Sequence, residues 1–188
     1  MRLRNVAIGV LAACSALSAH AKTISHFHLF AKDSRIPDAL PLRYVANQFG
    51  CKGDNVSPAL SWRGAPPGTR SFVLTLFDPD ERSTPSGWWH WVVYDLPPNT
   101  SSVPANAGAE RSAALPKGAL EGRTDLGNRG YVGPCPALGD PPHKYLFTLY
   151  ALRVGKLPVG DGASGAMVTS VAQQYLLGKA TLTVPYRR

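Results

Sequence analysis

The chain has 188 residues, of which 44% are hydrophobic, so it is long enough for one domain with a hydrophobic core and leaves little room for a second. Gly and Pro are abundant, at 18 and 17 residues, while only 17% of residues are charged, a profile that favours short strands joined by turns over a helical bundle. The formal net charge is +8, but the Lys and Arg residues are dispersed and no nucleic-acid motif accompanies them, which argues against a nucleic-acid-binding protein.

The first 21 residues have the organisation of a secretory signal peptide. Two early arginines are followed by an apolar run too short to span a bilayer comfortably, and Ala19-His20-Ala21 offers a small-x-small cleavage pattern. The letters LAAC at 11–14 resemble a lipoprotein box, so lipidation of Cys14 is the alternative, although the signal before it would be very short. We therefore expect a single mature domain over residues 22–188, exported to the periplasm or secreted.

Cleavage after Ala21 leaves two cysteines, Cys51 and Cys135. In an oxidising compartment outside the cytoplasm, a remaining pair of cysteines favours a disulfide over two free thiols. We therefore predict a bond between Cys51 and Cys135.

The first predicted strand covers residues 24–30, where apolar and polar side chains alternate. His26 and His28 share its polar face at a spacing that two metal ligands can have. Because no third ligand lies nearby in the sequence, we favour two solvent-exposed histidines over a metal site.

Short or apolar runs predict four further strands, at residues 57–62, 71–77, 88–96 and 144–152. In residues 88–96 the two-residue period of a strand places Trp88, His90, Val92 and Tyr94 on one face and Trp89, Trp91 and Val93 on the other. The same alternation, extended back from residue 144, places His143, Tyr145, Phe147 and Leu149 on one face.

Two other segments complete the chain. Residues 97–142 show little periodicity, and so long an irregular connection is usually either functional or disordered. Residues 164–178 predict a helix with Ser164 as its N-cap, Gly178 after its end, and an apolar stripe of Val168, Val171, Ala172, Tyr175 and Leu176. Residues 180–186 then alternate as a last strand.

Polar groups stand at the ends of three of these strands. Asp78 follows residues 71–77, His90 lies near the start of the next strand, and His143 and Tyr145 open a third. If those ends converge, two imidazoles, a carboxylate and a phenol share one cavity. The alternative is that each group is satisfied separately by local hydrogen bonds.

Four strings, in order, resemble the phosphatidylethanolamine-binding protein family, and most closely its bacterial Raf-kinase-inhibitor-like YbhB/YbcL group. They are CKGDNVSPALSW (51–62), DPD…GWWHW (78–91), RTDLGNRGYVGPCP (123–136) and PPHKYLFTLYAL (141–152). The resemblance implies a mainly β fold, with a large central antiparallel sheet packed with a smaller sheet and a few peripheral helices, one of them near the C-terminus.

The resemblance also implies a pocket for phosphate-like or carboxylate-like anions, phospholipid head groups among them. Carried over by position, its residues are Asp78, Pro79, Trp88, Trp89, His90, Gly133, Pro134, His143 and Tyr145. We expect protonated imidazoles to donate to the anion, a nearby carboxylate to favour their charged form, and a glycine to let backbone N–H groups approach. The lining of such a pocket would be positive.

The sequence departs from the family pattern at two places beside this pocket. Glu81-Arg82-Ser83-Thr84 precedes Pro85 where the family usually continues with Ala-Pro, and CPALGD follows the Gly-Pro turn. These departures leave the ligand preference open.

We therefore expect a non-enzymatic binding protein without cofactor or metal. Peripheral membrane contact and a homodimer are further expectations, and modulation of signalling proteins is one that comes from eukaryotic relatives. The alternative is a metal-dependent hydrolase that uses Asp78, His90 and His143 as ligands. A nucleophilic hydrolase is disfavoured because the Gly-x-Ser-x-Gly motif is missing.

Overall fold

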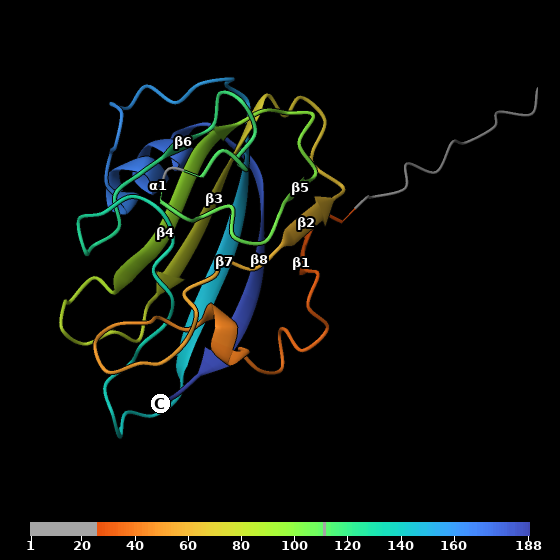
Figure 1. Cartoon of the computed structure of the whole chain (residues 1–188). Coiled ribbons are helices and arrows are strands. Elements are labelled where there is room, and N and C mark those ends of the chain that lie inside the picture. The colour runs from red at the N-terminus through yellow and green to blue at the C-terminus, as the bar shows by residue number, and fades with distance from the viewer. Residues whose placement is uncertain (1–25, 111) are drawn as a thin grey trace, which may run out of the picture.

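A computed structural model describes residues 26–110 and 112–188. The predicted signal peptide, its cleavage site and Cys14 lie outside these ranges. Within them are two antiparallel sheets and one α-helix, α1 (Gly165–Gln174) (Figure 1). No helix of the described part of the chain is long and apolar enough to cross a membrane.

The larger sheet has five strands in the order β6-β4-β3-β7-β8. Their bounds are Leu120–Glu121 for β6, Trp88–Leu96 for β4, Ser71–Asp78 for β3, His143–Leu152 for β7 and Leu176–Tyr186 for β8. The smaller sheet has the order β1-β2-β5, with bounds His28–Ala31, Leu60–Arg63 and Ser102–Val103. A short 3-10 helix, η1, covers Leu42–Tyr44. The predicted mainly β architecture, with a large and a small sheet, is confirmed.

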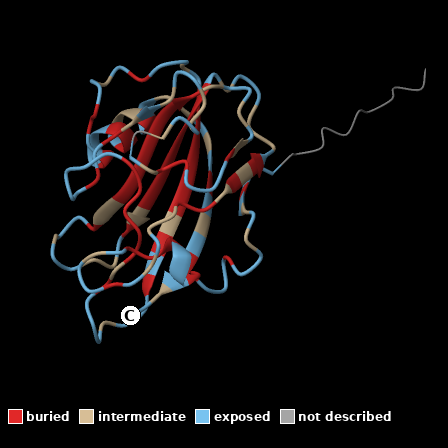
Figure 2. Ribbon diagram, viewed as in Figure 1, coloured by how far each residue is buried: buried red, intermediate tan, exposed pale blue. Residues whose placement is uncertain are grey.

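The two faces of the large sheet bury separate hydrophobic clusters. The small sheet packs over one face, where Leu60 and Trp62 join Phe72 and Phe147 in what we call the first core. Helix α1 covers the other face, where Val168 contributes to a second core. Figure 2 shows that the central strands are buried along most of their length, as expected for strands covered on both faces.

Helix α1 is shorter than its sequence pattern predicts. Its N-cap is confirmed, because Ser164 Oγ accepts from the backbone N–H of Met167 at 3.3 Å. The helix ends at Gln174, however, and Gly178 lies inside β8, where it pairs with Ala151. The ladder between β7 and β8 satisfies backbone groups that one more helical turn would have used, so tertiary pairing overrides local propensity here.

A β-bulge in β4 changes the predicted facing of its side chains. Leu76 of β3 pairs with Trp91, but the next residue, Phe77, pairs with Trp89, so His90 is an extra residue opposite β3. The prediction that one alternation runs through the whole strand is therefore wrong, because it breaks at His90: Trp89 lies on the face of Val92 and Tyr94 rather than on that of Trp91 and Val93. Trp91 and Val93 face the first core, while Val92 and Tyr94 face the second.

The long connection over residues 97–142 contains the two-residue strands β5 and β6, and specific bonds hold much of the rest. Tyr131 Oη donates to the carbonyl of Tyr44 at 2.6 Å. Asn55 Nδ2 donates to the carbonyl of Tyr131 at 3.1 Å. The predicted disulfide between Cys51 and Cys135 is present and adds a covalent link between the same two regions.

Candidate functional site

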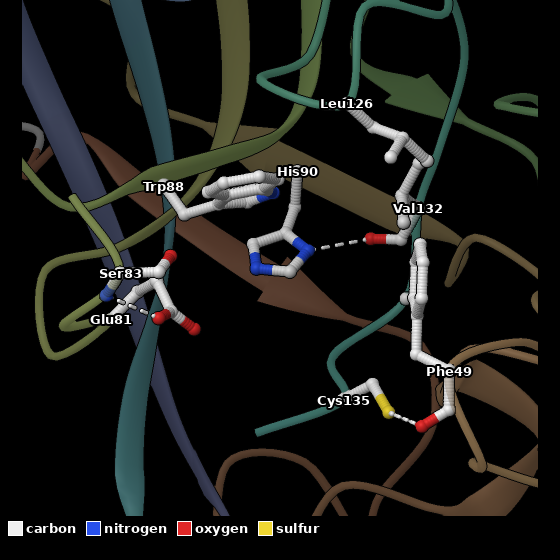
Figure 3. A pocket seen from close by; sticks show the side chains of 9 residues that line it. Phe49, Glu81, Ser83, Trp88, His90, Leu126, Val132 and Cys135 are labelled. Carbon is white, nitrogen blue, oxygen red and sulfur yellow. Dashed lines mark hydrogen bonds between the residues drawn. The ribbon is translucent and has the colours of Figure 1, made fainter. Parts of the chain in front are cut away.

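One end of the large sheet opens into a pocket of about 250 Å³, shown in Figure 3. Side chains from β4, from the loop after β3 and from two other loops form its walls. The lining residues are Phe49, Glu81, Ser83, Trp88, His90, Leu126, Val132, Gly133 and Cys135.

His90 is the buried polar group of this pocket. Its Nδ1 lies 2.9 Å from the carbonyl oxygen of Val132, and because a carbonyl can only accept, Nδ1 carries the hydrogen. Burial lowers the pKa of His90 despite this bond and the nearby carboxylates, so the ring is neutral at neutral pH. In the neutral ring, Nε2 is a hydrogen-bond acceptor.

Asp78 and His143 form a buried pair behind the pocket. His143 Nδ1 donates to Asp78 Oδ2 at 2.7 Å, and both side chains are almost completely buried. Burial lowers the pKa of His143, but the hydrogen bond and charge of Asp78, with a further contribution from Asp140, outweigh it and raise that pKa overall. His143 Nε2 lies 3.4 Å from Asp140 Oδ2, so carboxylates face both ring nitrogens.

Tyr145 lies between the two imidazoles. Its ring contacts His90 edge to face, with centroids 5.4 Å apart, and stacks on His143 at 6.3 Å. The side chain is fully buried, and no hydrogen bond from the described residues reaches its hydroxyl. Burial and the charge of Asp78 raise the pKa of Tyr145, so the phenol keeps its proton.

A second hollow, of about 430 Å³, lies on the other side of Glu81. Pro79 and His143 line it, together with Asp80 and the loop that carries Arg82. Glu81 lines both hollows. It therefore separates the pocket that His90 lines from the hollow that His143 lines.

The structure brings most of the predicted site residues to this region. They are divided between the pocket, the second hollow and a buried layer behind them. Trp88, His90 and Gly133 line the pocket, and Pro79 and His143 line the second hollow. Asp78 and Tyr145 lie buried behind them, and Pro134 is buried with its carbonyl accepting from Ala46 N–H at 3.2 Å.

Trp89 is not part of the pocket. It packs on Phe77, with ring centroids 4.3 Å apart, and against Gly165 at the start of α1. Trp89 therefore lies on the helix-covered face of the sheet, where it supports the second core.

Gly133 has a different role from the expected one. Its N–H donates to Asn55 Oδ1 at 2.8 Å, so it is not directed at a ligand. A Cβ at this position would approach the backbone of Tyr44 and Ala46 to 2.4–2.5 Å. Glycine is needed here because two backbone segments pass close together, and that closeness shapes the pocket wall.

Sequence reasoning missed several lining residues, notably Phe49, Glu81 and Leu126. Glu81 follows directly on the Asp78-Pro79-Asp80 string, and Phe49 lies two residues before Cys51, so each was next to a recognised feature. Glu81 also opens the segment that departs from the family pattern beside the pocket, but Phe49 had no sequence signal of its own, because only the folded loops turn these side chains toward His90.

The lining is not positive, and that expectation was wrong. None of the described residues that line the pocket is Lys or Arg, and His90 is neutral. Glu81 is ionised, since the N–H of Ser83 donates to Oε1 at 2.8 Å and lowers its pKa. Charge in the pocket wall therefore comes from a carboxylate.

The predicted metal triad of Asp78, His90 and His143 does not form. Within the described ranges, the three potential ligands that lie within 4.8 Å of one another are Asp78, Glu81 and His143. His90 is not among them. His26 and His28 lie together with ring centroids 5.8 Å apart and are exposed, without a third ligand among the residues that the structure covers.

Comparison with known proteins identifies one family. Residues 30–187 match the family model described as phosphatidylethanolamine-binding protein. Escherichia coli YbhB is 45% identical over 158 residues, which cover 84% of this chain and 98% of YbhB. Escherichia coli YbcL is 40% identical over 160 residues, covering 85% of this chain and 87% of YbcL.

Solved structures agree with this result. The crystal structure of Escherichia coli YbcL superimposes with a TM-score of 0.82 at 40% identity, covering 86% of this chain and 98% of that chain. A Chlamydia trachomatis structure described as a homologue of phosphatidylethanolamine-binding protein gives a TM-score of 0.72 at 28% identity, covering 87% and 99% of the two chains.

Proposed function

The chain belongs to the phosphatidylethanolamine-binding protein family, in the branch of YbhB and YbcL, and from this premise we propose that it binds small ligands with a phosphate or carboxylate group, phospholipid head groups among them, in the pocket at His90. The ligand is held without chemical conversion. One observation carries this proposal: a buried imidazole, fixed by Val132, presents its Nε2 to a pocket of about 250 Å³.

The protonation state of His90 makes the binding of an anion depend on pH. Because Nε2 carries no hydrogen in the neutral ring, an anion can bind there only with a proton, held either on Nε2 or on the ligand oxygen. Trp88 limits water on one side, which strengthens such a bond. Affinity for an anion should therefore rise as the pH falls below about 6.5, the ordinary pKa of histidine.

Isothermal titration with phosphoethanolamine and inorganic phosphate, between pH 5.5 and 8, tests the proposal. We expect weak binding by the wild type that strengthens at low pH. In His90→Asn, the asparagine amide can still donate to Val132 but lacks Nε2, so affinity should fall about 10- to 100-fold, the effect of one charged hydrogen bond.

The exposed His28→Asn variant serves as the matched control and should bind like the wild type. Because His90→Asn lacks the imidazole, any pH dependence that remains in its affinity comes from titration of the ligand itself. Wild-type affinity in His90→Asn would refute the site.

Export is the second part of the proposed function. The disulfide between Cys51 and Cys135 supports an oxidising location. A Mycobacterium tuberculosis relative, 35% identical over 135 residues, carries a name that describes it as a lipoprotein. N-terminal sequencing of the protein from a periplasmic or culture fraction should find Lys22 first, whereas lipidation would leave the chain starting at Cys14. A homodimer and peripheral membrane contact stay predictions.

A further inference from the structure

We propose that the disulfide between Cys51 and Cys135 is a site of thiol–disulfide exchange with low-molecular-weight thiols and dithiols. A small thiol enters the pocket and attacks Cys135, while the guanidinium of Arg188 stabilises the Cys51 thiolate that departs. This inference does not depend on which ligand the pocket binds, because it concerns the chemistry of the pocket wall.

The two sulfurs differ in access. Cys135 lines the pocket of about 250 Å³ and is partly exposed, whereas Cys51 is only 7% exposed and belongs to the first core. Figure 3 shows the sulfur of Cys135 beside the carbonyl oxygen of Phe49, at the edge of the pocket. Exchange requires that a thiolate reach one sulfur of the disulfide directly. The pocket therefore directs the attack to Cys135.

Arg188 places a cation beside both sulfurs. Its Nη1 lies 3.6 Å from Cys135 Sγ and 3.8 Å from Cys51 Sγ, and it donates to the carbonyl of Phe49 at 2.8 Å. Among the described residues, no Asp or Glu forms an ion pair with this guanidinium. Its charge is therefore available to a thiolate. A nearby cation lowers the pKa of a thiol and makes its thiolate a better leaving group.

The surroundings of Cys135 select Cys51 as the leaving group. The carbonyl oxygens of Gln48 and Phe49 lie 3.6 and 3.7 Å from Cys135 Sγ. Their partial negative charges disfavour a thiolate on Cys135, because like charges repel. The polar contact that the described residues provide to Cys51 Sγ is the one with Arg188. Negative charge is therefore more stable on Cys51.

The exchange proceeds in balanced steps. The incoming thiolate forms a bond to Cys135 Sγ, the bond between the two cysteines breaks, and its electron pair leaves on Cys51 Sγ, which then takes a proton from water. A monothiol stops at this mixed disulfide. A dithiol continues, because its second thiolate attacks its own first sulfur and releases Cys135. The dithiol is then oxidised, the protein disulfide is reduced to two thiols, and the wall that holds Phe49 is no longer cross-linked.

Reduction of the folded mature chain by dithiothreitol, measured by alkylation of the released thiols and mass spectrometry, tests the role of Arg188. Arg188→Gln should slow reduction about two- to fivefold at low ionic strength, because the leaving thiolate loses one partly exposed ion pair. Arg188→Lys keeps the charge and should react nearly as fast as the wild type. High salt should bring the rate of the wild type close to that of Arg188→Gln.

Arg187→Gln is the matched control, because Arg187 is also exposed but forms no hydrogen bond to either sulfur among the described residues. It should react as the wild type. If Arg188 only held the two loops together, its loss would loosen them and speed reduction. Faster or unchanged reduction of Arg188→Gln would therefore overturn its role. A wild type that dithiothreitol reduces only after unfolding in urea would overturn the exchange site itself.

The monothiol 2-mercaptoethanol tests which sulfur is attacked. After acid quenching and peptide mapping of the folded chain, we expect the mercaptoethanol adduct on Cys135 and a free thiol on Cys51. An adduct on Cys51 would contradict the assignment of the two sulfurs, and so would its absence from both cysteines.

Discussion

His90 and His143 show how local surroundings give one residue type two charge states. Both are buried and lie on either side of Tyr145. His90 faces a carbonyl and keeps a lowered pKa, whereas Asp78 and Asp140 raise the pKa of His143. A carboxylate within hydrogen-bond distance decides the difference, because its charge stabilises the imidazolium.

These opposite shifts predict how stability depends on pH. His90 binds fewer protons in the folded than in the unfolded state, so its contribution is present above pH about 6.5 and is lost as the pH falls below it. His143 binds more protons when folded, so its contribution is present below pH about 6.5 and is lost as the pH rises through its raised pKa.

Urea unfolding from pH 5 to 9 measures both contributions. His90→Asn should reduce the loss of stability on the acid side, and His143→Asn should reduce the loss on the alkaline side. Asparagine replaces the Nδ1 donor in each case, so the bonds to Val132 and Asp78 can be kept. Each unit of pKa difference between the folded and unfolded states corresponds to about 1.4 kcal/mol of unfolding free energy. If both variants kept the wild-type dependence of unfolding free energy on pH, the assignment of the two pKa shifts to His90 and His143 would be contradicted.

Strand β4 positions the pocket through an irregularity. The bulge at His90 lets Trp88 and His90 face the pocket while Trp91 continues into the first core. Bulges often redirect side chains at functional sites. Trp89, on the opposite face, is held between Phe77 and Gly165, so the packing of α1 supports the strand that carries the pocket histidine.

Gly165→Ala tests this contact between helix and strand. A Cβ at residue 165 would approach Trp89 Cγ to 2.4 Å, so the variant should lose about 1–3 kcal/mol of unfolding free energy through overpacking. Gly160→Ala is the matched control, because nothing lies within 4 Å of its Cβ position and its φ is not positive. The control should be neutral or gain about 0.4–1 kcal/mol. Equal stability of both variants in urea unfolding would count against the tight packing.

At the scale of the whole molecule, the pocket is assembled from segments far apart in the sequence. Cys51 and Cys135 are 84 residues apart and join the loop that carries Phe49 to the segment that carries Gly133. Asn55 adds two hydrogen bonds between the same regions, to Tyr131 and Gly133. One wall of the pocket is therefore a covalently linked pair of loops.

Removal of this disulfide should affect stability and the pocket together. The double variant Cys51→Ser with Cys135→Ser should lose about 2–5 kcal/mol of unfolding free energy, because the unfolded chain is no longer cross-linked. Ligand affinity should fall as well, since Phe49 is held less firmly. Reductant should weaken the wild type and leave the double variant unchanged, as measured by urea unfolding and titration. If reductant weakened the wild type and the double variant equally, its effect would not come from the bond between Cys51 and Cys135.

The sequence by itself indicated six of the eight strands of the described residues, the family and the disulfide, and it missed the two-residue strands β5 and β6. The apolar run of residues 71–77 predicts a strand buried on both faces. Once the predicted cleavage removes Cys14, the two remaining cysteines can pair only with each other. The positions of Asp78, His90, His143 and Tyr145 at strand ends left open whether these groups converge, and the resemblance to the family favoured one shared pocket.

Only the tertiary structure decided how those groups function. The register between β3 and β4 created the bulge at His90, and the ladder of β8 shortened the helix before Gly178. The charge of the pocket depends on burial and on distances between loops, which no local pattern contains. For that reason His90 is neutral, Gly133 spaces two backbones, and Glu81 rather than a cation borders the pocket.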